Sequence, residues 1–264
     1  MKSVLITNDD GINAPALAPL ARALSRVAQV TVVAPSGERS WIGKAITRVG
    51  PVATRPVVRD GIEMWSIDGY PADCVQIGAF GILDTPPDLV VSGINIGSNR
   101  GSAFVSGSGT LGAVVEASNT GLPGVAFSAM SSGEWKTWVE WVHTPDGLEM
   151  WERLAHIAAG LVLDVLELGI PDDVDVLSVN LPPDATQKTP RKVTHLARTR
   201  YGRLFAGNGG VYHHDFDGIL HVDGDLAGSD LEALDAGFIS ITPIRMANSV
   251  QLGTALRHRL EGPR

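Results

Sequence analysis

The chain has 264 residues, a formal net charge of −8, 44% hydrophobic residues and a mean hydropathy of +0.11. These values allow one large domain with a sizeable core, and the acidic balance disfavours binding to a nucleic-acid duplex or an anionic membrane surface. The single cysteine, Cys74, excludes an internal disulfide and a cysteine-based zinc site. No apolar run has the length of a membrane span or a signal peptide, so we expect a cytoplasmic protein.

The first 35 residues predict a strand, a helix and a second strand. "VLIT" (residues 4–7) and "VTVVAP" (30–35) are β-branched runs typical of buried parallel strands. Between them, "APALAPLARALSRVA" carries leucines at helical spacing and a proline near its start. This order is the βαβ unit of a parallel sheet.

The middle of the chain continues the same alternation. Residues 43–69 alternate and are rich in turns, which predicts an antiparallel excursion, and residues 71–83 predict a helix. Then come a strand at 88–93, a glycine-rich loop, a helix at 109–120, a strand at 124–129, a long helix at 147–169 and a strand at 174–182. Residues 131–147 are expected to be exposed. Beyond residue 185 we expect strands near 192–199 and 238–242. The pattern predicts an α/β fold.

Polar residues follow three of the predicted strands, at the edge where open parallel sheets bind ligands. Asp9 and Asp10 follow the first strand, Ser40 follows the second, and Asn95 follows the strand at 88–93. Both aspartates can serve one site only if the chain turns, which Gly11 permits. Two carboxylates, a hydroxyl and an amide carbonyl suit magnesium, manganese or calcium better than zinc. We therefore predict a divalent cation at this edge.

Each of these residues also has a purely structural interpretation. Asp-Asp-Gly after a strand is often a capped turn, and taken alone this interpretation is favoured by roughly two to one. Ser40 alone could be a helix cap, and Asn95 alone a turn residue. The convergence of three oxygen-bearing loops on one edge of the sheet favours a site.

The segment "SGSGTLGAVV" is a second signal. Gly107, Gly109 and Gly112 match the dinucleotide pattern GxGxxG, but the match is weak, because the motif does not directly follow its strand and no acidic residue stands about 20 positions on. A helix start that binds phosphate through free N–H groups and the helix dipole fits better. A plain helix cap by Ser108 or Thr110 has equal weight.

Two further patterns favour structure over chemistry. Residues 212–225, "YHHDFDGILHVDGD", lack EF-hand spacing and a helical HxxxH pair, so a solvated hairpin or interface arm is favoured over a metal site. Trp135, Trp138 and Trp141 recur every third residue, which predicts a packed helical face. Cys74 lies in a predicted helix and is interpreted as a buried thiol.

Several stretches, in this order, resemble the SurE (survival protein E) family of metal-dependent phosphatases and nucleotidases. They are "ITNDDGINAPAL", "VTVVAPSGERS", "AIT", "DGYPADCV", "PDLVVSGINIGSNRG", "SGTLGA" and, more loosely, "VNLP" and "GFISITP". The resemblance implies a Rossmann-like, three-layer, mostly parallel sheet in a catalytic core of residues 1–185. It also implies that residues 186–264 form an extended C-terminal arm that assembles a homodimer or homotetramer.

The resemblance and the chemistry of the side chains together predict roles for named residues. One magnesium or manganese ion, or calcium in crystals, would be held by Asp9, Asp10, Ser40 and Asn95. Asp9 would orient or deprotonate the attacking water and Asp10 would be a ligand, or the reverse. The implied activity is release of phosphate from 5′- or 3′-nucleoside monophosphates, with polyphosphate trimming in some members. The substrate phosphate would be held by Asn99, Ser108, Gly109 and Thr110.

The sequence departs from the family pattern in three places that concern substrate fit. Trp41 replaces a small residue after Ser40, Ser102 and Ala103 replace acidic residues, and the stretch from Asn95 to "SGT" is one residue longer. One alternative is therefore a catalytically weakened, nucleotide-binding regulatory protein of the same fold. Another makes an aspartate the nucleophile, as in D-x-D phosphatases, although adjacent aspartates do not have that spacing.

Overall fold

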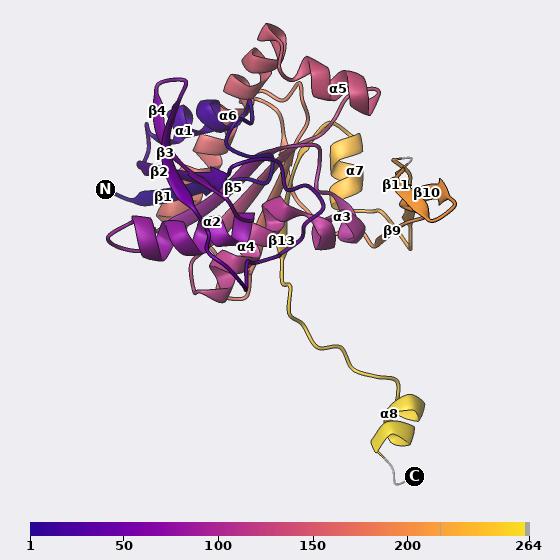
Figure 1. Ribbon diagram of the computed structural model, residues 1–264. Coiled ribbons are helices and arrows are strands. Elements are labelled where there is room, and N and C mark those ends of the chain that lie inside the picture. The colour runs from indigo at the N-terminus through magenta and orange to yellow at the C-terminus, as the bar shows by residue number, and fades with distance from the viewer. Residues whose placement is uncertain (217, 262–264) are drawn as a thin grey trace.

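A computed structural model describes residues 1–216 and 218–261 of the chain. Within these ranges a nine-stranded sheet forms the centre of the molecule (Figure 1). The strands from β4 to β7 run parallel, β3 and β13 are antiparallel to their inner neighbours, and β8 is parallel to β13. In spatial order the strands are β3 (Thr54–Arg59), β4 (Ile62–Ile67), β2 (Gln29–Pro35), β1 (Ser3–Thr7), β5 (Leu89–Ile96), β6 (Gly124–Ala129), β7 (Val176–Leu181), β13 (Ile239–Ile244) and β8 (Arg191–Val193). The predicted mostly parallel α/β sheet is confirmed.

Strand β1 lies where the chain changes direction across the sheet. It pairs with β2 on one side, where Ile6 is opposite Val32, and with β5 on the other, where Thr7 is opposite Ser92. The chain runs from β1 outward through β2 and β4, then returns to the other side of β1 at β5. Such a reversal opens a crevice at the carboxyl ends of the strands, where ligands bind in open α/β sheets.

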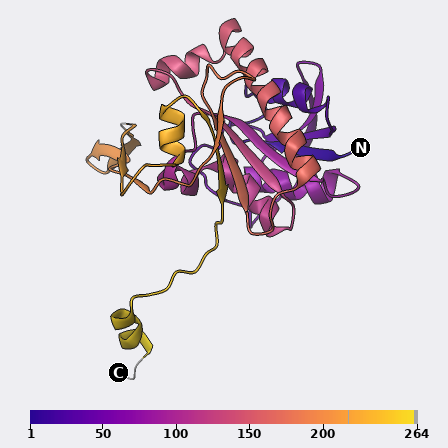
Figure 2. The same ribbon diagram turned by 180° about the vertical axis from the view of Figure 1, so that it is seen from behind.

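Helices cover both faces of the sheet (Figures 1 and 2). On one face α1 (Leu17–Leu24) packs against α6 (Pro145–Leu168), and on the other α2 (Pro71–Ile77) packs against α4 (Gly109–Asn119). Neighbouring strand residues point to opposite faces, so Ile6 belongs to the core under α1 and α6, whereas Leu5 belongs to the core that contains Cys74 of α2. Cys74 is fully buried, as predicted, and burial raises the pKa of its thiol. A single π-helical turn, η1 (Gly78–Ile82), follows α2.

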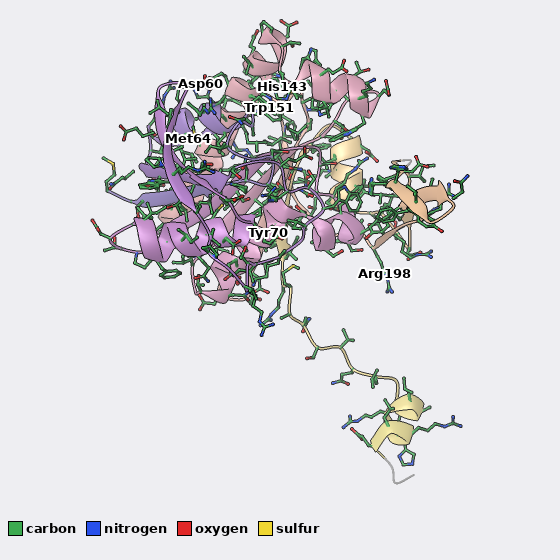
Figure 3. All side chains as sticks on the ribbon, in the orientation of Figure 1. Asp60, Met64, Tyr70, His143, Trp151 and Arg198 are labelled. Atoms are coloured by element: carbon green, nitrogen blue, oxygen red, sulfur yellow. The ribbon has the colours of Figure 1, made fainter. Side chains whose placement is uncertain are left out.

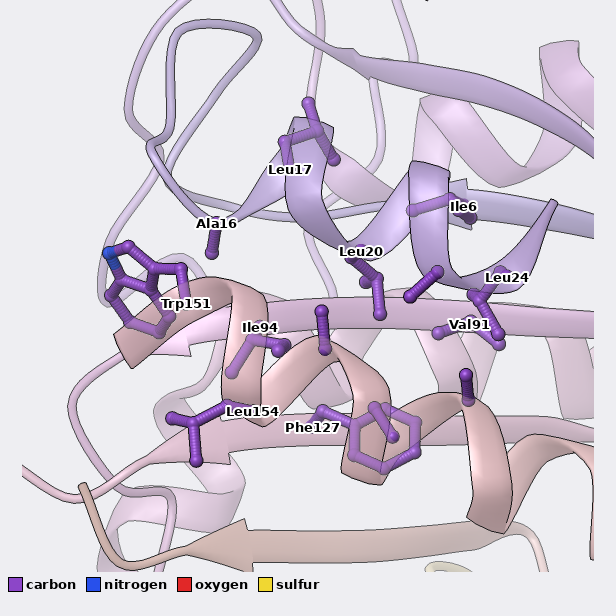
Figure 4. Packing of buried hydrophobic residues seen from close by; sticks show 14 of the residues in the cluster. Ile6, Ala16, Leu17, Leu20, Leu24, Val91, Ile94, Phe127, Trp151 and Leu154 are labelled. Atoms are coloured by element: carbon purple, nitrogen blue, oxygen red, sulfur yellow. The ribbon is translucent and has the colours of Figure 1, made fainter. Parts of the chain in front are cut away.

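The larger core forms where α1 and α6 meet the sheet (Figure 4). Leu17, Leu20 and Leu24 recur at helical spacing along α1, and all three are buried. Helix α6 begins at a Thr144 cap, whose hydroxyl accepts a 3.3 Å hydrogen bond from the Gly147 amide. The leucine stripe that the sequence shows is therefore the surface that α1 buries.

Two helices differ from the sequence predictions. The glycine-rich stretch between β5 and α4, predicted as a loop, contains the short helix α3 (Gly101–Gly107). Residues 131–147, predicted to be exposed, contain α5 (Trp135–Trp141), in which Trp138 is only 3% exposed and stacks on Trp141. The prediction of a packed tryptophan face is confirmed for Trp138 and Trp141 and is wrong for Trp135, which is 55% exposed. The prediction of a wholly exposed segment is wrong for Trp138.

The C-terminal part adds two small antiparallel pairs and a tail. Strand β9 (Thr199–Tyr201) pairs with β12 (Leu220–Val222), and β10 (Phe205–Asn208) pairs with β11 (Val211–His214). After α7 (Asp230–Asp235) and β13, the chain runs away from the body to α8 (Thr254–Glu261), which has no buried residue (Figures 1 and 3). None of the described helices is long and apolar enough to cross a bilayer.

Candidate functional site

The two aspartates follow β1 in a tight turn. The Asn8 side chain brackets this turn, because its Nδ2 donates to the Gly11 carbonyl at 3.0 Å and its Oδ1 accepts from the Gly11 amide at 3.1 Å. Gly11 has φ +92, and a Cβ there would lie 2.8 Å from the carbonyl carbon of Gly37. Only glycine fits this position without strain. The turn on which the sequence argument depended is therefore present.

Asp9 is buried against the start of α4. Its side chain is 4% exposed, and its Oδ1 accepts a 2.6 Å hydrogen bond from the Thr110 hydroxyl. The backbone of Gly109 approaches so closely that a Cβ there would lie 2.7 Å from the Asp9 Cβ. The Asp9 carbonyl accepts from the Arg39 amide at 2.7 Å, which joins β1 to the loop after β2. Asp9 thus contacts two of the predicted segments.

Asp10 contacts the third segment. Its side chain is half-buried, and its Oδ2 accepts a 3.1 Å hydrogen bond from the Ile96 amide at the end of β5. The neighbouring Asn95 donates from Nδ2 to the Gly97 carbonyl at 2.7 Å. Among the hydrogen bonds of the described residues, the Asn95 amide oxygen accepts none, so it is the atom that a cation can use. The structure brings Asp10 and Asn95 to the same edge.

Ser40 lies on the loop after β2, one residue beyond the Arg39 amide that binds the Asp9 carbonyl. It is exposed, and its hydroxyl donates to Oε1 of Glu38 at 2.6 Å. Glu38 is a carboxylate that the sequence argument missed. The negative charge of Glu38 contributes to raising the pKa of the Asp10 carboxyl. Ser40 retains its lone pairs as acceptors for a ligand.

The electrostatics of the pair favour a cation. Burial raises the pKa of Asp9 to about 6, against the smaller lowering effect of the Thr110 hydrogen bond. Burial, followed by the charge of Asp9, raises the pKa of Asp10. No ion pair among the described residues includes either aspartate. The two carboxylates are therefore desolvated without a positive side chain to neutralise them.

The donor set also fits a hard cation. The described residues contain no group of three or more histidine, cysteine, aspartate or glutamate side chains placed to hold a metal ion. A cation at this edge would therefore use two carboxylates together with hydroxyl and amide oxygens, as magnesium and manganese do. The histidine-rich residues 212–225 do not form a metal cluster in the described positions either, and Asp217 lies outside them. Both histidines of β11 are exposed, as a solvated hairpin requires.

The predicted phosphate-binding residues of α4 have separate tasks. Ser108 is the helix cap, because its Oγ accepts from the Leu111 amide at 3.2 Å. Thr110 is fully buried, and its hydroxyl donates a hydrogen bond to Asp9. Gly109 opens the first turn between Ser108 and Thr110, beside the Asp9 side chain. The cap interpretation therefore applies to Ser108, and Thr110 belongs to the aspartate site.

Asn99 is held in a buried polar network. Its Nδ2 donates to Ser128 Oγ at 2.8 Å and lies 3.4 Å from Thr110 Oγ1, and its backbone amide donates to Asn180 Oδ1 at 2.8 Å. Ser128 and Asn180 end β6 and β7 at the same edge of the sheet. Neither residue is among those predicted from the sequence, although a polar residue near the end of a buried strand was the available signal.

Two clefts lie apart from this site. One of about 480 Å³ is bordered by α1 and the β3–β4 turn, and one of about 380 Å³ is bordered by α5. None of the eight predicted site residues lines either cleft. The aspartate site is defined here by its hydrogen bonds and charges.

Comparisons with known proteins agree with this architecture. The family described as "Survival protein SurE" matches residues 4–203. The chain is 34% identical over 254 residues to the 5′-nucleotidase SurE of Methanocella arvoryzae, covering 92% of this chain and 91% of that one. It is 35% identical over 248 residues to the 5′-nucleotidase SurE of Methanoregula boonei, covering 92% of each.

Two further comparisons concern about half of the chain and the whole fold. The 5′-nucleotidase SurE of Methanopyrus kandleri is 50% identical over 125 residues, 47% of this chain and 48% of that one. The crystal structure of the SurE protein from Aquifex aeolicus superposes with a TM-score of 0.77 at 29% identity, covering 98% of this chain and all of that one. The regulatory alternative finds no support among these relatives. The chain belongs to the SurE family.

Proposed function

We propose that this chain is a metal-dependent phosphomonoesterase that releases phosphate from nucleoside monophosphates. The observation that carries the proposal is the desolvated Asp9–Asp10 pair, which lies at the point where the sheet reverses and touches the first turn of α4. The relatives named as 5′-nucleotidases give the reaction class. A carboxylate pair beside a helix N-terminus suits a phosphate that binds through a divalent ion and backbone N–H groups.

The metal centre of this proposal uses Asp9, Asp10, Ser40 and Asn95. When bound, a magnesium or manganese ion supplies Lewis-acid stabilisation of the phosphate charge and lowers the pKa of a water molecule. Asp10 is held to β5 by the Ile96 amide and is suited to ligation. Asp9 has one oxygen fixed by the Thr110 hydroxyl, and backbone N–H groups of Gly109 and Thr110 also act on its carboxylate. A carboxylate oriented in this way is suited to orient a water or to accept its proton.

The phosphate, in this proposal, lies at the N-terminus of α4. The first N–H groups of the helix have no intrahelical partner, and the helix dipole adds positive potential there. Ser108 already bonds one of these groups, the Leu111 amide. The Gly109 and Thr110 amides interact with the Asp9 carboxylate and lower its pKa. In this proposal they are shared between Asp9 and the substrate phosphate. Asn99 lies within 3.4 Å of Thr110 and completes this side of the site.

A phosphate-release screen tests the function directly. Purified enzyme is incubated with 5′- and 3′-nucleoside monophosphates, a nucleoside diphosphate, a cyclic diester and polyphosphate, each with magnesium, manganese or excess chelator. We expect metal-dependent release that is fastest from a monophosphate, because one cation and one helix terminus match a single terminal dianion. Full turnover in chelator, or faster hydrolysis of the diester, contradicts the proposal.

We also propose that residues 186–264 act as an oligomerisation element. The support is the stretch after β13, which leaves the body and ends in α8 without burying any residue of that helix. Val250, Leu252, Leu256 and Leu260 are exposed along it. Light scattering on the full chain and on a chain ending at residue 245 tests this. A dimer or tetramer that dissociates on truncation is expected, and an unchanged mass contradicts the arm's role.

A further inference from the structure

Trp41 has an unusual place beside the proposed metal centre. It directly follows Ser40, has φ +58, and leaves 41% of its surface exposed. The left-handed region is unfavourable for a bulky side chain, and such positions concentrate at ligand-binding sites. Burial alone does not explain why an indole is held there, because nearly half of the residue remains in contact with solvent.

The ring is held by other aromatic side chains. Trp41 contacts Phe104 of α3 at a centroid distance of 5.7 Å, and from the C-terminal part it contacts Tyr201 at 5.6 Å, His214 at 5.3 Å and Phe216 at 5.8 Å. Three of these contacts are edge-to-face, so these neighbours do not cover the indole by parallel stacking. The indole is therefore fixed in orientation before any ligand arrives.

Trp41 also adjoins the proposed phosphate site. A Cβ placed on Gly107 would lie 3.5 Å from its ring, and the Gly43 amide donates to the Gly107 carbonyl at 2.9 Å. The next residue, Ile42, comes within 3.0 Å of a Cβ placed on Gly109, the same position that Asp9 crowds. Residues 40–43 thus run from the proposed ligand Ser40 to a position beside the end of α3 and the start of α4.

We propose that Trp41 is a specificity-determining residue, whose exposed ring stacks on the base of a nucleoside monophosphate while the phosphate occupies the α4 terminus. The proposal rests on the proposed function. Stacking tolerates any base, and loss of one aromatic platform weakens nucleic-acid binding by about 5- to 100-fold. A ring that is already fixed loses little entropy when the base binds.

The test compares substrates with and without a base. Adenosine 5′-monophosphate and ribose 5-phosphate share the phosphate and the sugar, so only the base distinguishes them. We expect the wild-type KM for the nucleotide to be about 5- to 100-fold lower than that for the sugar phosphate. Trp41→Ala should remove this difference by raising the nucleotide KM, with kcat largely retained. Trp41→Phe should restore part of it.

Two control variants separate stacking from a structural role. Phe205→Ala removes an exposed ring of the C-terminal part. Among the described residues this ring contacts His214 but not Trp41. The ratio of the sugar-phosphate KM to the nucleotide KM should therefore not change. Trp135, which is 55% exposed and packs on Gly97 at the end of β5, is the rival platform. If Trp135→Ala abolishes the ratio and Trp41→Ala does not, the assignment to Trp41 is wrong. Equal increases of both KM values in Trp41→Ala also overturn it.

Failure of the proposed function has a different signature. If neither substrate releases phosphate with magnesium or manganese, the hydrolytic proposal fails, and calorimetric titration of both compounds into wild type and Trp41→Ala then decides the stacking proposal. Tighter binding of the nucleotide that depends on Trp41 supports it. Equal binding of the two compounds to wild type rejects it, whether or not the enzyme turns over.

Discussion

The Thr110 hydroxyl donates a 2.6 Å hydrogen bond to Oδ1 of Asp9, although the two residues are 101 positions apart in the chain. This bond joins the first turn of α4 to the residue pair that ends β1. It fixes one carboxylate oxygen and thereby determines the orientation of the other. Thr110, which the sequence predicts as a phosphate ligand or a helix cap, is thus also a positioning residue for the predicted metal centre.

Thr110→Ala should therefore impair catalysis. We expect kcat/KM for a nucleoside monophosphate to fall by about 10- to 100-fold, because a hydrogen bond to a charged group is worth roughly 1.5–3 kcal/mol. Thr110→Ser keeps the hydroxyl and should recover most of the activity. Steady-state kinetics of both variants provide the measurement. An alanine variant with unchanged kcat/KM would show that the bond to Asp9 has no catalytic role.

Ser108→Ala is the matched control on the same helix. Ser108 accepts from the Leu111 amide as the N-cap, so its loss should lower the free energy of unfolding by about 0.5–2 kcal/mol. Its effect on kcat/KM should be smaller than that of Thr110→Ala. The opposite result, a stable Ser108→Ala variant with strongly reduced kcat/KM, would assign the serine hydroxyl to the substrate.

The stability of the metal-free protein should depend on pH through Asp9. Its pKa is about 6 in the folded chain against an ordinary value of 3.8, so between these two values the folded state binds the extra proton. This contribution to stability is fully present below about pH 4 and is lost as the pH rises through 6. Its size is on the order of 3 kcal/mol. Asp9→Asn should remove this pH dependence.

Chemical denaturation in chelator at several pH values between 4 and 7.5 measures this effect. The difference between wild type and Asp9→Asn separates the contribution of Asp9, together with its effect on Asp10, from that of the other carboxyl groups. Saturating magnesium should reverse this pH dependence for the wild type, so that stability rises with pH. The ion binds the ionised carboxylates, and the stabilisation by the bound ion is lost as the pH falls and they are protonated. A difference that does not vary with pH would contradict the buried, uncompensated state of Asp9.

Asp10→Asn should abolish metal-dependent activity while leaving the metal-free fold as stable or more stable. The amide keeps an oxygen for the Ile96 N–H, and it removes a charge that burial and Asp9 both disfavour. Wild type should gain Tm with manganese or magnesium, by an amount equivalent to about 2.7 kcal/mol at 100 times Kd, and the variant should not. Thermal melts with metal and with chelator provide the comparison. A variant that is stabilised by metal as strongly as wild type would remove Asp10 from the ligand set.

Much of the fold follows from short-range patterns in the sequence. The β-branched runs at 4–7 and 30–35 became β1 and β2, and the leucines at 17, 20 and 24 became the buried face of α1. These patterns are informative because burial selects apolar residues at the period of the element that carries them. The edge of the sheet follows as well, because parallel strands have their carboxyl ends together.

The rest depends on contacts between distant residues. Helix α3 is not visible in "GSAFVSG", because its start is held by Asp230, 129 positions away. The Asn99 network with Ser128 and Asn180 likewise depends on the order of β5, β6 and β7 in the sheet. The helix cap could not be assigned between Ser108 and Thr110 by sequence alone, since either hydroxyl suits the position. Only the structure places Asp9 beside the second of them.

Asp230 anchors the segment after Asn99 to the C-terminal part of the chain. Its carboxylate is almost fully buried, and it accepts from the amides of Gly101 at 2.7 Å, Ala197 at 2.9 Å and Leu231 at 3.0 Å. Asp230→Asn replaces one accepting oxygen with an NH₂ group that faces a backbone donor. We expect a loss of about 2–3 kcal/mol, or roughly 5–10 °C in Tm.

Asp235→Asn is the control for this prediction, because Asp235 ties α7 to the same segment from the surface. Its side chain is 62% exposed and pairs with Arg100 at 2.5 Å. Exposed ion pairs contribute about 0–1 kcal/mol, so this variant should melt within about 2–3 °C of wild type. Asp230→Asn should also lower kcat/KM, because Gly101 lies two residues after Asn99, whereas Asp235→Asn should not. Equal melting temperatures for the two variants would mean that the buried carboxylate does not hold the start of α3.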